Sequence, residues 1–291
     1  MELVILGSGT CFPAAPGAAF RYPPLFALNV AGPGAEAQWV VFDCSEGARW
    51  RLGAAGIDPA KVEHLALSHP HADHAALPSF MQARACTAIA DRSTARPLHF
   101  YLPRASAEAL PSLWAWHQPE DGGRATSRFP LVIVPCDHGS EAELWPGVRL
   151  GAFAVHHGHG KNPALAFRVE AAGGSFAYSG DSGICEGLSA AARGVDLFLC
   201  EASARVGDEA MGRGYGHLNP RQAAELATEA GAKLVVLTHY SGADPDEAML
   251  DDARSEAPSL PVQIAHDGER IVFGAATGLE QGDGVRVGPR G

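Results

Sequence analysis

Basic residues are scarce in this sequence: 22 lysines and arginines stand against 33 aspartates and glutamates, which gives a formal net charge of −11. This balance disfavours a general nucleic-acid or anionic-membrane surface, because both are bound through clustered positive charge. No segment approaches the ~20 consecutive apolar residues of a membrane span. The start of the chain also lacks the basic and apolar regions of a signal peptide. We therefore expect a cytoplasmic protein with no membrane contact.

The six cysteines are scattered, and no two of them have CxxC spacing. Neither a thiolate zinc site nor a disulfide framework is indicated, and we expect reduced thiols. Repeats, low-complexity tracts and linkers are absent too, while 46% of the residues are hydrophobic, enough for a sizeable core. The expected organisation is one domain over residues 1–274, followed by a glycine-rich tail over residues 275–291 that we predict to be loose.

Short apolar runs bounded by glycine, proline and polar clusters predict many strands, with helices between some of them. Strands are predicted over residues 3–6, 25–30, 39–42, 64–67, 98–102, 131–134, 148–155, 165–170, 176–178, 195–200, 234–237, 262–265 and 270–273. Helices are predicted over residues 46–53, 75–87, 105–116, 188–193, 220–230 and 245–256, with Asn219 capping the fifth and Gly231 ending it. This pattern favours an α/β (α+β) fold in which two sheets pack together and helices cover both outer faces, a four-layer αββα sandwich.

Potential metal ligands are concentrated in one run, where His69, His71, Asp73 and His74 fall within six residues directly after a predicted strand. Imidazole and carboxylate groups are the usual non-thiolate ligands of zinc, and they also suit manganese and iron. One ion could not easily use all four groups and still keep a position open for water. The run therefore predicts two metal ions that share a loop.

Three later segments place further ligand types where strands are predicted to end. They are Val155-His156-His157-Gly158, Gly180-Asp181-Ser182 and Leu237-Thr238-His239. Each is weak evidence alone, because a turn or a histidine after a strand is common. Strand ends that converge on one edge of a sheet are nevertheless where binding sites are often built.

Together these segments resemble the metallo-β-lactamase-fold hydrolases, in the branch that contains ribonuclease Z and related phosphodiesterases. The resemblance covers residues 1–273 and implies the metallo-β-lactamase form of the αββα sandwich. Its motifs occur in the family's order: Leu6-Gly7-Ser8-Gly9-Thr10, Phe42-Asp43-Cys44-Ser45-Glu46-Gly47, HxHxDH over residues 69–74, the three segments above, and Gly216-His217-Leu218 before the last of them.

The resemblance implies two divalent metal ions per chain, zinc first and manganese or iron as alternatives, with seven ligands. These are His69, His71 and His157 for one ion, Asp73, His74 and His239 for the other, and Asp181 as the bridge. His157 is preferred over His156 because it directly precedes a small residue, as in the family, and because neighbouring strand residues face opposite ways. His159 is a further alternative.

The implied nucleophile is a hydroxide that bridges the two metals, and Asp73 could orient it. His217 matches the family's catalytic histidine, and Glu201 matches a residue that we expect to orient His217 through a hydrogen bond. Four residues in loops that should border the site could bind phosphate oxygens, although a solvated loop position is the alternative for each. They are Lys161, Asn162, Arg213 and Tyr215.

Ribonuclease Z-like enzymes typically carry an arm that grips transfer RNA, in the bacterial type between the strand after the third histidine and the Gly-Asp motif. Here only residues 171–175 join the two predicted strands, so no such exosite fits. We expect a phosphodiesterase acting on a small phosphodiester such as a cyclic nucleotide. Hydrolysis of a carboxylic ester, lactone or aryl sulfate on the same site is the alternative. A ribonuclease Z-type RNA endonuclease and a non-catalytic metal-binding protein are less favoured functions. Because relatives are often homodimers, a homodimer is the expected assembly.

Overall fold

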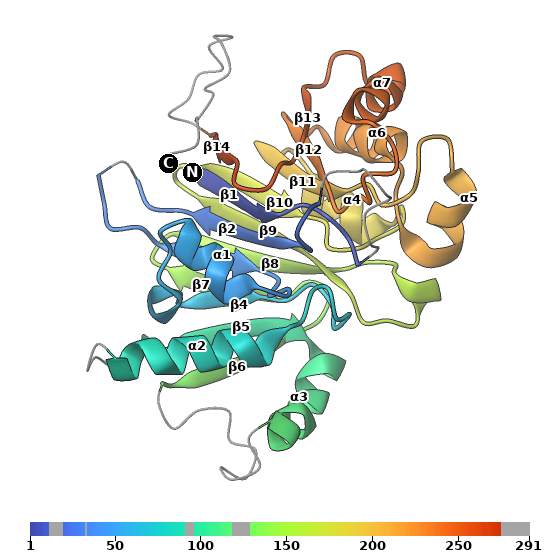
Figure 1. Cartoon of the computed structure of the whole chain (residues 1–291). Coiled ribbons are helices and arrows are strands. Elements are labelled where there is room, and N and C mark those ends of the chain that lie inside the picture. The colour runs from blue at the N-terminus through green and yellow to red at the C-terminus, as the bar shows by residue number, and fades with distance from the viewer. Residues whose placement is uncertain (12–19, 33, 91–95, 118–128, 275–291) are drawn as a thin grey trace.

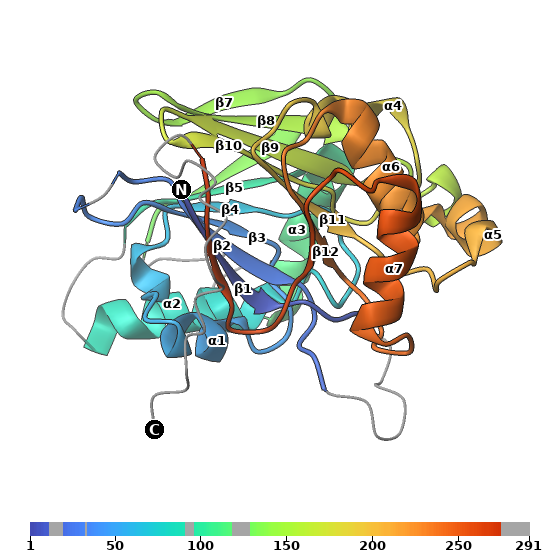
Figure 2. The same cartoon turned by 90° about the horizontal axis from the view of Figure 1, so that it is seen from above.

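The computed structural model describes residues 1–11, 20–32, 34–90, 96–117 and 129–274. Within these residues the strands form two seven-stranded sheets that pack face to face, with helices on both outer faces (Figures 1 and 2). The predicted four-layer αββα sandwich is confirmed. The tail predicted over residues 275–291 lies outside the described residues, and the single domain over residues 1–274 stays a prediction.

The first sheet has the strand order β14-β1-β2-β3-β4-β5-β6. Its strands are β1 (Glu2–Gly7), β2 (Leu25–Asn29), β3 (Trp39–Phe42), β4 (His64–Ala66), β5 (Leu98–Pro103), β6 (Leu131–Cys136) and β14 (Arg270–Val272). Strands β3 to β6 run parallel. Helices α1 (Ala48–Ala54), α2 (Leu77–Ala90) and α3 (Arg104–His117) pack on the outer face through residues such as Leu52, Phe80 and Leu110.

The second sheet has the order β13-β12-β11-β10-β9-β8-β7. Its strands are β7 (Glu141–Trp145), β8 (Val148–Ala154), β9 (Leu165–Ala171), β10 (Gly174–Tyr178), β11 (Leu197–Glu201), β12 (Val235–Thr238) and β13 (Val262–Ile264). Strands β10 to β13 run parallel. Helices α4 (Glu186–Ala192), α6 (Pro220–Ala230) and α7 (Asp246–Glu256) cover its outer face. Short helices complete the chain: η1 (Pro59–Lys61), η3 (Gly158–Gly160), α5 (Glu209–Met211) and η4 (Gly212–Gly216).

Aromatic rings fill the space between the two sheets. Phe26 and Phe42 of the first sheet meet Phe176 and Tyr178 of the second, and the ring centroids of Phe42 and Phe176 lie 5.2 Å apart. Each fully buried ring contributes about 2–3 kcal/mol through the hydrophobic effect. This layer holds the two sheets at a fixed separation, and therefore fixes the relative positions of the loops at their edges.

All six cysteines lie in the described residues and are free thiols, as predicted. None of the described helices combines the length and the apolar character needed to cross a bilayer. One strand, β7, was not predicted. Its sequence contains Glu141 and Glu143, and only Leu144 among its five residues is buried. It is an edge strand of the second sheet, so its charged alternation gives little apolar signal.

Candidate metal centre

The parallel strands determine where the candidate site lies. Asp43 follows β3, His69 comes shortly after β4, Asp181 follows β10 and His239 follows β12, while Glu201 is the last residue of β11. In each sheet these strands run parallel, so their carboxyl ends meet at one edge. Because the sheets are packed face to face, the two edges bring the loops that follow them together.

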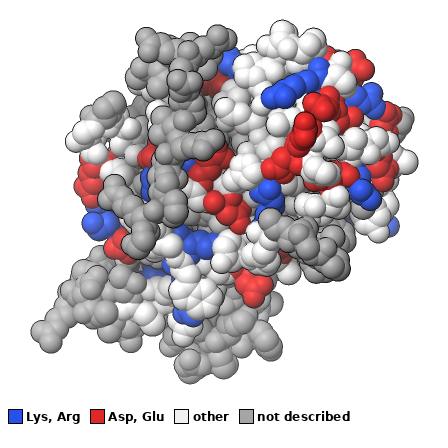
Figure 3. Space-filling view, turned by 45° about the horizontal axis from the view of Figure 1, so that its top comes forward, with Lys and Arg blue, Asp and Glu red and all other residues white. Residues whose placement is uncertain are grey.

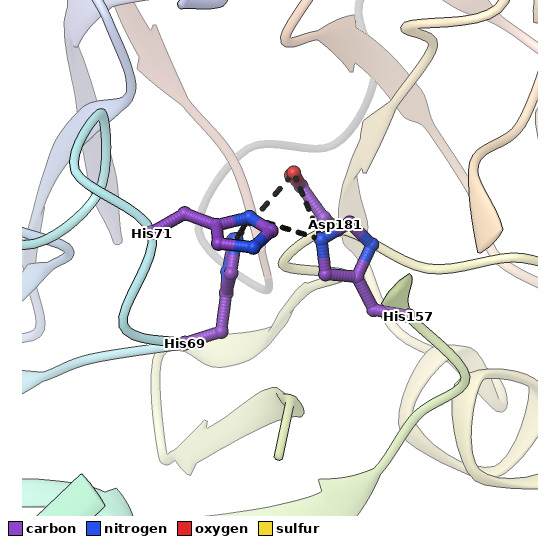
Figure 4. A group of neighbouring side chains, drawn as sticks. All are labelled: His69, His71, His157 and Asp181. Carbon is purple, nitrogen blue, oxygen red and sulfur yellow. Dashed lines mark hydrogen bonds and ion pairs between the residues drawn. The ribbon is translucent and has the colours of Figure 1, made fainter. Parts of the chain in front are cut away.

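The first predicted ligand set converges on one point (Figure 4). Nδ1 of His71 lies 3.0 Å from Nε2 of His69 and 3.2 Å from Nε2 of His157. Oδ2 of Asp181 lies 3.6 Å from Nε2 of His69 and 3.9 Å from Nε2 of His157. Zinc–nitrogen bonds of 2.0–2.1 Å place two nitrogens of a tetrahedral shell about 3.3 Å apart. The spacing of these four side chains therefore suits one metal ion.

The second predicted set is equally compact. Nε2 of His74 lies 3.3 Å from Nε2 of His239. Oδ2 of Asp73 lies 3.5 Å from Nε2 of His239 and 3.8 Å from Nε2 of His74. Burial raises the pKa of Asp73, but the hydrogen bond with His239 and the charge of His74 outweigh burial and lower it to about 2. This carboxylate is therefore ionised at neutral pH, as a metal ligand must be.

Asp181 lies between the two sets and turns one oxygen toward each. Oδ2 faces the first set, while Oδ1 lies 3.4 Å from Nε2 of His74 and 3.3 Å from Nδ1 of His239. The side chain is buried, yet Oδ1 accepts no hydrogen bond from any described residue. Burial raises the pKa of Asp181, but His239, His74 and His69 hold it well below its usual value. A buried anionic oxygen without a donor requires positive charge nearby, so this donor set fits two bridged cations.

The ring of His74 is oriented from behind by Asp43. Nδ1 of His74 donates to Oδ2 of Asp43 at 2.7 Å, and its Nε2 faces Asp181. Asp43 is fully buried and also accepts from the backbone N–H and the hydroxyl of Ser68 and from the hydroxyl of Tyr178. A carboxylate behind a histidine is the usual partner of a metal-binding imidazole.

His157 and His239 are oriented in the same way. Nδ1 of His157 donates to the carbonyl of Gly216 at 3.2 Å, and Nδ1 of His239 donates to Oγ of Ser203 at 2.6 Å. Ser203 in turn donates to Oε2 of Glu201 at 2.6 Å, so its own proton is committed. These contacts assign the proton of each ring to Nδ1 and leave both Nε2 atoms free to bind a metal.

His71 uses the opposite nitrogen, and Asn162 occupies the other one. Nδ2 of the Asn162 side-chain amide lies 2.7 Å from Nε2 of His71 and donates to it, while Nδ1 of His71 faces the other members of the ligand set. Gly158 makes this contact possible, because a Cβ there would lie 2.3 Å from the Asn162 amide nitrogen. The predicted role of Asn162 in substrate binding stays a prediction, and its amide lies against a candidate metal ligand.

His217 stands beside the centre and is bonded to Glu201, the contact expected from the sequence. Nδ1 of His217 donates to Oε1 of Glu201 at 2.9 Å. Glu201 is fully buried and accepts three further hydrogen bonds, from the backbone N–H of Ser182 and from the N–H and hydroxyl of Ser203. Burial lowers the pKa of His217, but the charge and hydrogen bond of Glu201 outweigh burial and raise it to about 9. Its ligand-type atom lies within 4.8 Å of those of Asp181 and His239.

Neither alternative to His157 joins a ligand set among the described residues. His156 is exposed, whereas His157 is buried. His159 is exposed as well, and its ring packs against Tyr215 at a centroid distance of 4.8 Å. His157 is therefore the residue of the three that we retain as a candidate ligand.

The remaining substrate-binding candidates are peripheral or not described. Lys161 is exposed, and the ring of Tyr215 is 57% exposed on the loop that precedes His217. The side chain of Arg213 lies outside the described part of the chain. Their predicted contacts with phosphate oxygens stay predictions.

The residues that sequence reasoning missed are those behind the ligands: Asp43, Ser68, Tyr178 and Ser203. Asp43 is part of the motif Phe42-Asp43-Cys44-Ser45-Glu46-Gly47, but nothing in that motif predicted a role for its carboxylate. Ser68 directly precedes His69 and Ser203 follows Glu201 by two residues, so proximity in the sequence was an available signal for both. Tyr178 was identifiable only as a strand residue, because its contact with Asp43 depends on the packing of the two sheets.

Known proteins share both the sequence pattern and the fold. The family model described as Beta-lactamase superfamily domain matches residues 38–240. Ribonuclease BN of Escherichia coli is 27% identical over 311 residues, which covers 92% of this chain and 98% of that protein. The metallo-β-lactamase fold protein YhfI from Bacillus subtilis (TM-score 0.75, 19% identity) and the short form of human tRNase Z (TM-score 0.68, 21% identity) have similar structures. Each similarity covers 93% of this chain and 98% of the other. The chain therefore belongs to the beta-lactamase superfamily as a metallo-β-lactamase-fold hydrolase, with the ribonuclease Z-like relatives that its motifs predicted.

Proposed function

We propose that this protein is a dinuclear metal-dependent phosphodiesterase that acts on a small phosphodiester such as a cyclic nucleotide. The observation that carries the proposal is the position of Asp181, which turns one buried oxygen toward each of two compact ligand sets. Zinc is the proposed metal, because imidazole and carboxylate sets of this kind suit it. The free thiols favour a reducing compartment, which we propose to be the cytoplasm.

The metals would polarise the phosphoryl group and supply an activated water as the nucleophile. The protein side chains account for the rest of the proposed reaction. Asp73 is ionised and half-buried beside the second set, where it can orient the attacking water. Glu201 holds His217 and raises its pKa to about 9 in the metal-free protein, so His217 is placed to stabilise phosphate charge and give a proton to the leaving oxygen.

Phosphoester chemistry is favoured by the relatives, since ribonuclease BN and tRNase Z are both named for action on RNA. A large RNA is a poor fit for this chain. Strands β9 and β10 join through the two residues Ala172 and Gly173, which leaves no room for an arm at that point. The alignment with ribonuclease BN also spans 311 positions, more than the 291 residues of this chain, so the relative has segments without a counterpart here.

The surface charge supports the same choice. On the face shown in Figure 3, basic and acidic side chains are interspersed, and the basic ones form no continuous band. A polyanion would gain little from the described part of this face, because nucleic-acid affinity depends on many clustered phosphate contacts. A substrate with a single phosphate needs only the metal centre and His217.

The test measures metal content together with turnover of a substrate panel. The panel contains a bis-aryl phosphate, 2′,3′- and 3′,5′-cyclic nucleotides, a lactone and an aryl sulfate. We expect about two metals per chain and preference for a phosphodiester. Metal analysis identifies zinc, manganese or iron. Light scattering of the same preparation measures its molar mass and so tests the proposed homodimer.

Substitutions connect the turnover to the site. Asp181→Asn should lower both metal content and turnover. His217→Ala should retain metal and lose about 10²- to 10⁴-fold in rate on substrates with a poor leaving group. Fewer than two metals at saturation would contradict the dinuclear site. A preference for the lactone or sulfate over every phosphodiester would replace the proposed substrate class by the alternative.

A further inference from the structure

A cavity of about 450 Å³ lies next to the first ligand set. Its walls come from the start of α3, the turn between β6 and β7, and residues 162–165. Asn162 lines the cavity and also contacts His71 at 2.7 Å, so the Asn162 side chain and the His71 ring lie between the cavity and the metal position. Leu165, on the same wall, donates its backbone N–H to the carbonyl of Ser68, which precedes His69. This volume lies in the range of small-molecule sites, about 300–1,000 Å³.

Among the charged residues that line the cavity, negative charges outnumber positive ones. Arg104, at the start of α3, forms an ion pair with Asp137 in which Nη2 and Oδ2 lie 2.6 Å apart. Glu108 lies one helical turn after Arg104 on the same face of α3. Its carboxylate forms no ion pair with any described residue. The exposed charged residues of the lining are therefore one cation and two carboxylates, and this net negative charge modestly disfavours a further phosphate in the cavity.

The uncharged groups favour a hydroxyl-bearing ligand. Nδ1 of His138 accepts a hydrogen bond from the backbone N–H of Ala154 at 3.3 Å, so the neutral ring carries its proton on Nε2. His138 is thus a donor and Glu108 an acceptor on one wall. Pro103, Val155 and other apolar residues complete the lining and suit a carbon skeleton.

We propose that this cavity binds the organic group attached to the scissile phosphorus. This group is uncharged and bears hydroxyls, as a nucleoside does. The cavity excludes a second phosphate. The proposal rests on the proposed phosphodiesterase function. It narrows the substrate to a molecule with one phosphate and separates this chain from enzymes that act on polynucleotides or on compounds with several phosphates.

The experiment compares two substrates that share a leaving group. One is the p-nitrophenyl ester of thymidine 5′-phosphate, and the other carries an additional 3′-phosphate. For the metal-loaded protein at low ionic strength we expect kcat/KM to be about fivefold lower with the additional phosphate, as a repulsive charge about 4 Å away in an exposed site implies. Glu108→Lys should reduce or reverse this ratio. Glu247→Lys, the same charge change on the exposed start of α7, should leave the ratio as in the wild type.

Binding of the products provides a readout that needs no turnover. Calorimetry compares thymidine 5′-phosphate with thymidine 3′,5′-bisphosphate on the metal-loaded wild type and on Glu108→Lys, and the ratio of affinities should move in favour of the bisphosphate in the variant. Turnover of both esters with a ratio that Glu108→Lys leaves unchanged would overturn the cavity proposal and leave the phosphodiesterase standing. Absence of turnover with the expected change in binding would overturn the phosphodiesterase alone. Product affinities that Glu108→Lys does not alter would overturn the cavity proposal even without turnover.

Discussion

At the scale of single residues, the candidate centre depends on where each imidazole carries its proton. His74, His157 and His239 each donate a hydrogen bond from Nδ1 to an acceptor behind the ring, whereas Nε2 of His71 accepts one from Nδ2 of Asn162. A metal can bind only the nitrogen that has no proton. The acceptors therefore select the ligand atoms before any metal arrives, which lowers the cost of assembling the site.

Two adjacent histidines provide a matched pair of variants. His157→Ala removes a candidate ligand of the first set, so metal content should fall from about two to about one per chain, because a set of four ligands that loses one binds its metal weakly. His156→Ala changes an exposed neighbour and should keep both metals and the wild-type rate. Elemental analysis after dialysis measures the outcome. The reverse pattern would assign the ligand to His156.

The ring of His217 should titrate at an unusually high pH in the metal-free protein. Its pKa is raised from 6.5 to about 9, since Glu201 outweighs the effect of burial. Its contribution to stability is therefore complete below pH 6.5 and is lost as the pH rises through about 9. NMR titration of the ring measures the pKa directly. Glu201→Gln should lower the pKa of His217, because the effect of burial is then no longer opposed by the Glu201 charge. An unchanged pKa of His217 in this variant would show that Glu201 is not the cause of the shift.

At the scale of elements, the turns after the strands carry the site, and two of them are strained. Asp43 and His239 have φ angles of 58° and 57°, in the left-handed region that residues other than glycine rarely adopt. Each residue directly follows a parallel strand. Such conformations persist where the surrounding contacts hold them, as the hydrogen bonds of Asp43 and Ser203 do here.

The start of α6 is a further element that supports the site, because it directly follows His217. Oδ1 of Asn219 accepts from the backbone N–H of Gln222, and the Gln222 side chain accepts from the backbone N–H of Asn219. Asn219→Ala should lower the free energy of unfolding by about 1 kcal/mol, the usual value of an N-cap. Urea denaturation measures the change, with Asn219→Ser, which keeps a capping oxygen, as the control. Equal losses in both variants would show that the buried amide packs rather than caps.

At the scale of the whole molecule, the metals should contribute to stability. The metal-free centre holds Asp73 and Asp181 as anions among five histidines, and the buried Oδ1 of Asp181 accepts no hydrogen bond from a described residue. A ligand at about 100 times its Kd adds about 2.7 kcal/mol to the native state. For a chain of 291 residues this raises Tm by roughly 5–10 °C.

Differential scanning calorimetry with and without zinc measures this shift. Asp181→Asn should lose most of it, since one metal then lacks the bridging charge. Magnesium at the same concentration should give little shift, because it prefers an octahedral shell of oxygen ligands. A Tm that does not respond to zinc in the wild type would contradict the metal centre.

Much of the fold followed from local sequence, because apolar periodicity and turn residues act over a few positions. Helix α6 was predicted with its cap at Asn219 and its end at Gly231, which has a φ of 73°. The edge strand β7 was missed, since a strand with one buried residue carries almost no apolar pattern. The histidine run was found by its chemistry, because it is a rare combination of metal-binding groups, and the later ligand candidates followed from the family resemblance of their motifs.

The sequence by itself indicated the layered fold class and a metal-binding run over residues 69–74, since these depend on residue type and spacing, and the family resemblance of its motifs implied the full ligand set. Tertiary structure alone decided how those residues are used. The packed sheets place Asp181 between the two sets, put Tyr178 and Ser68 behind Asp43, and bring Asn162 onto His71. These contacts join residues far apart in the chain, so no local pattern records them. The cavity beside His71 likewise exists only where α3, the β6–β7 turn and residues 162–165 meet.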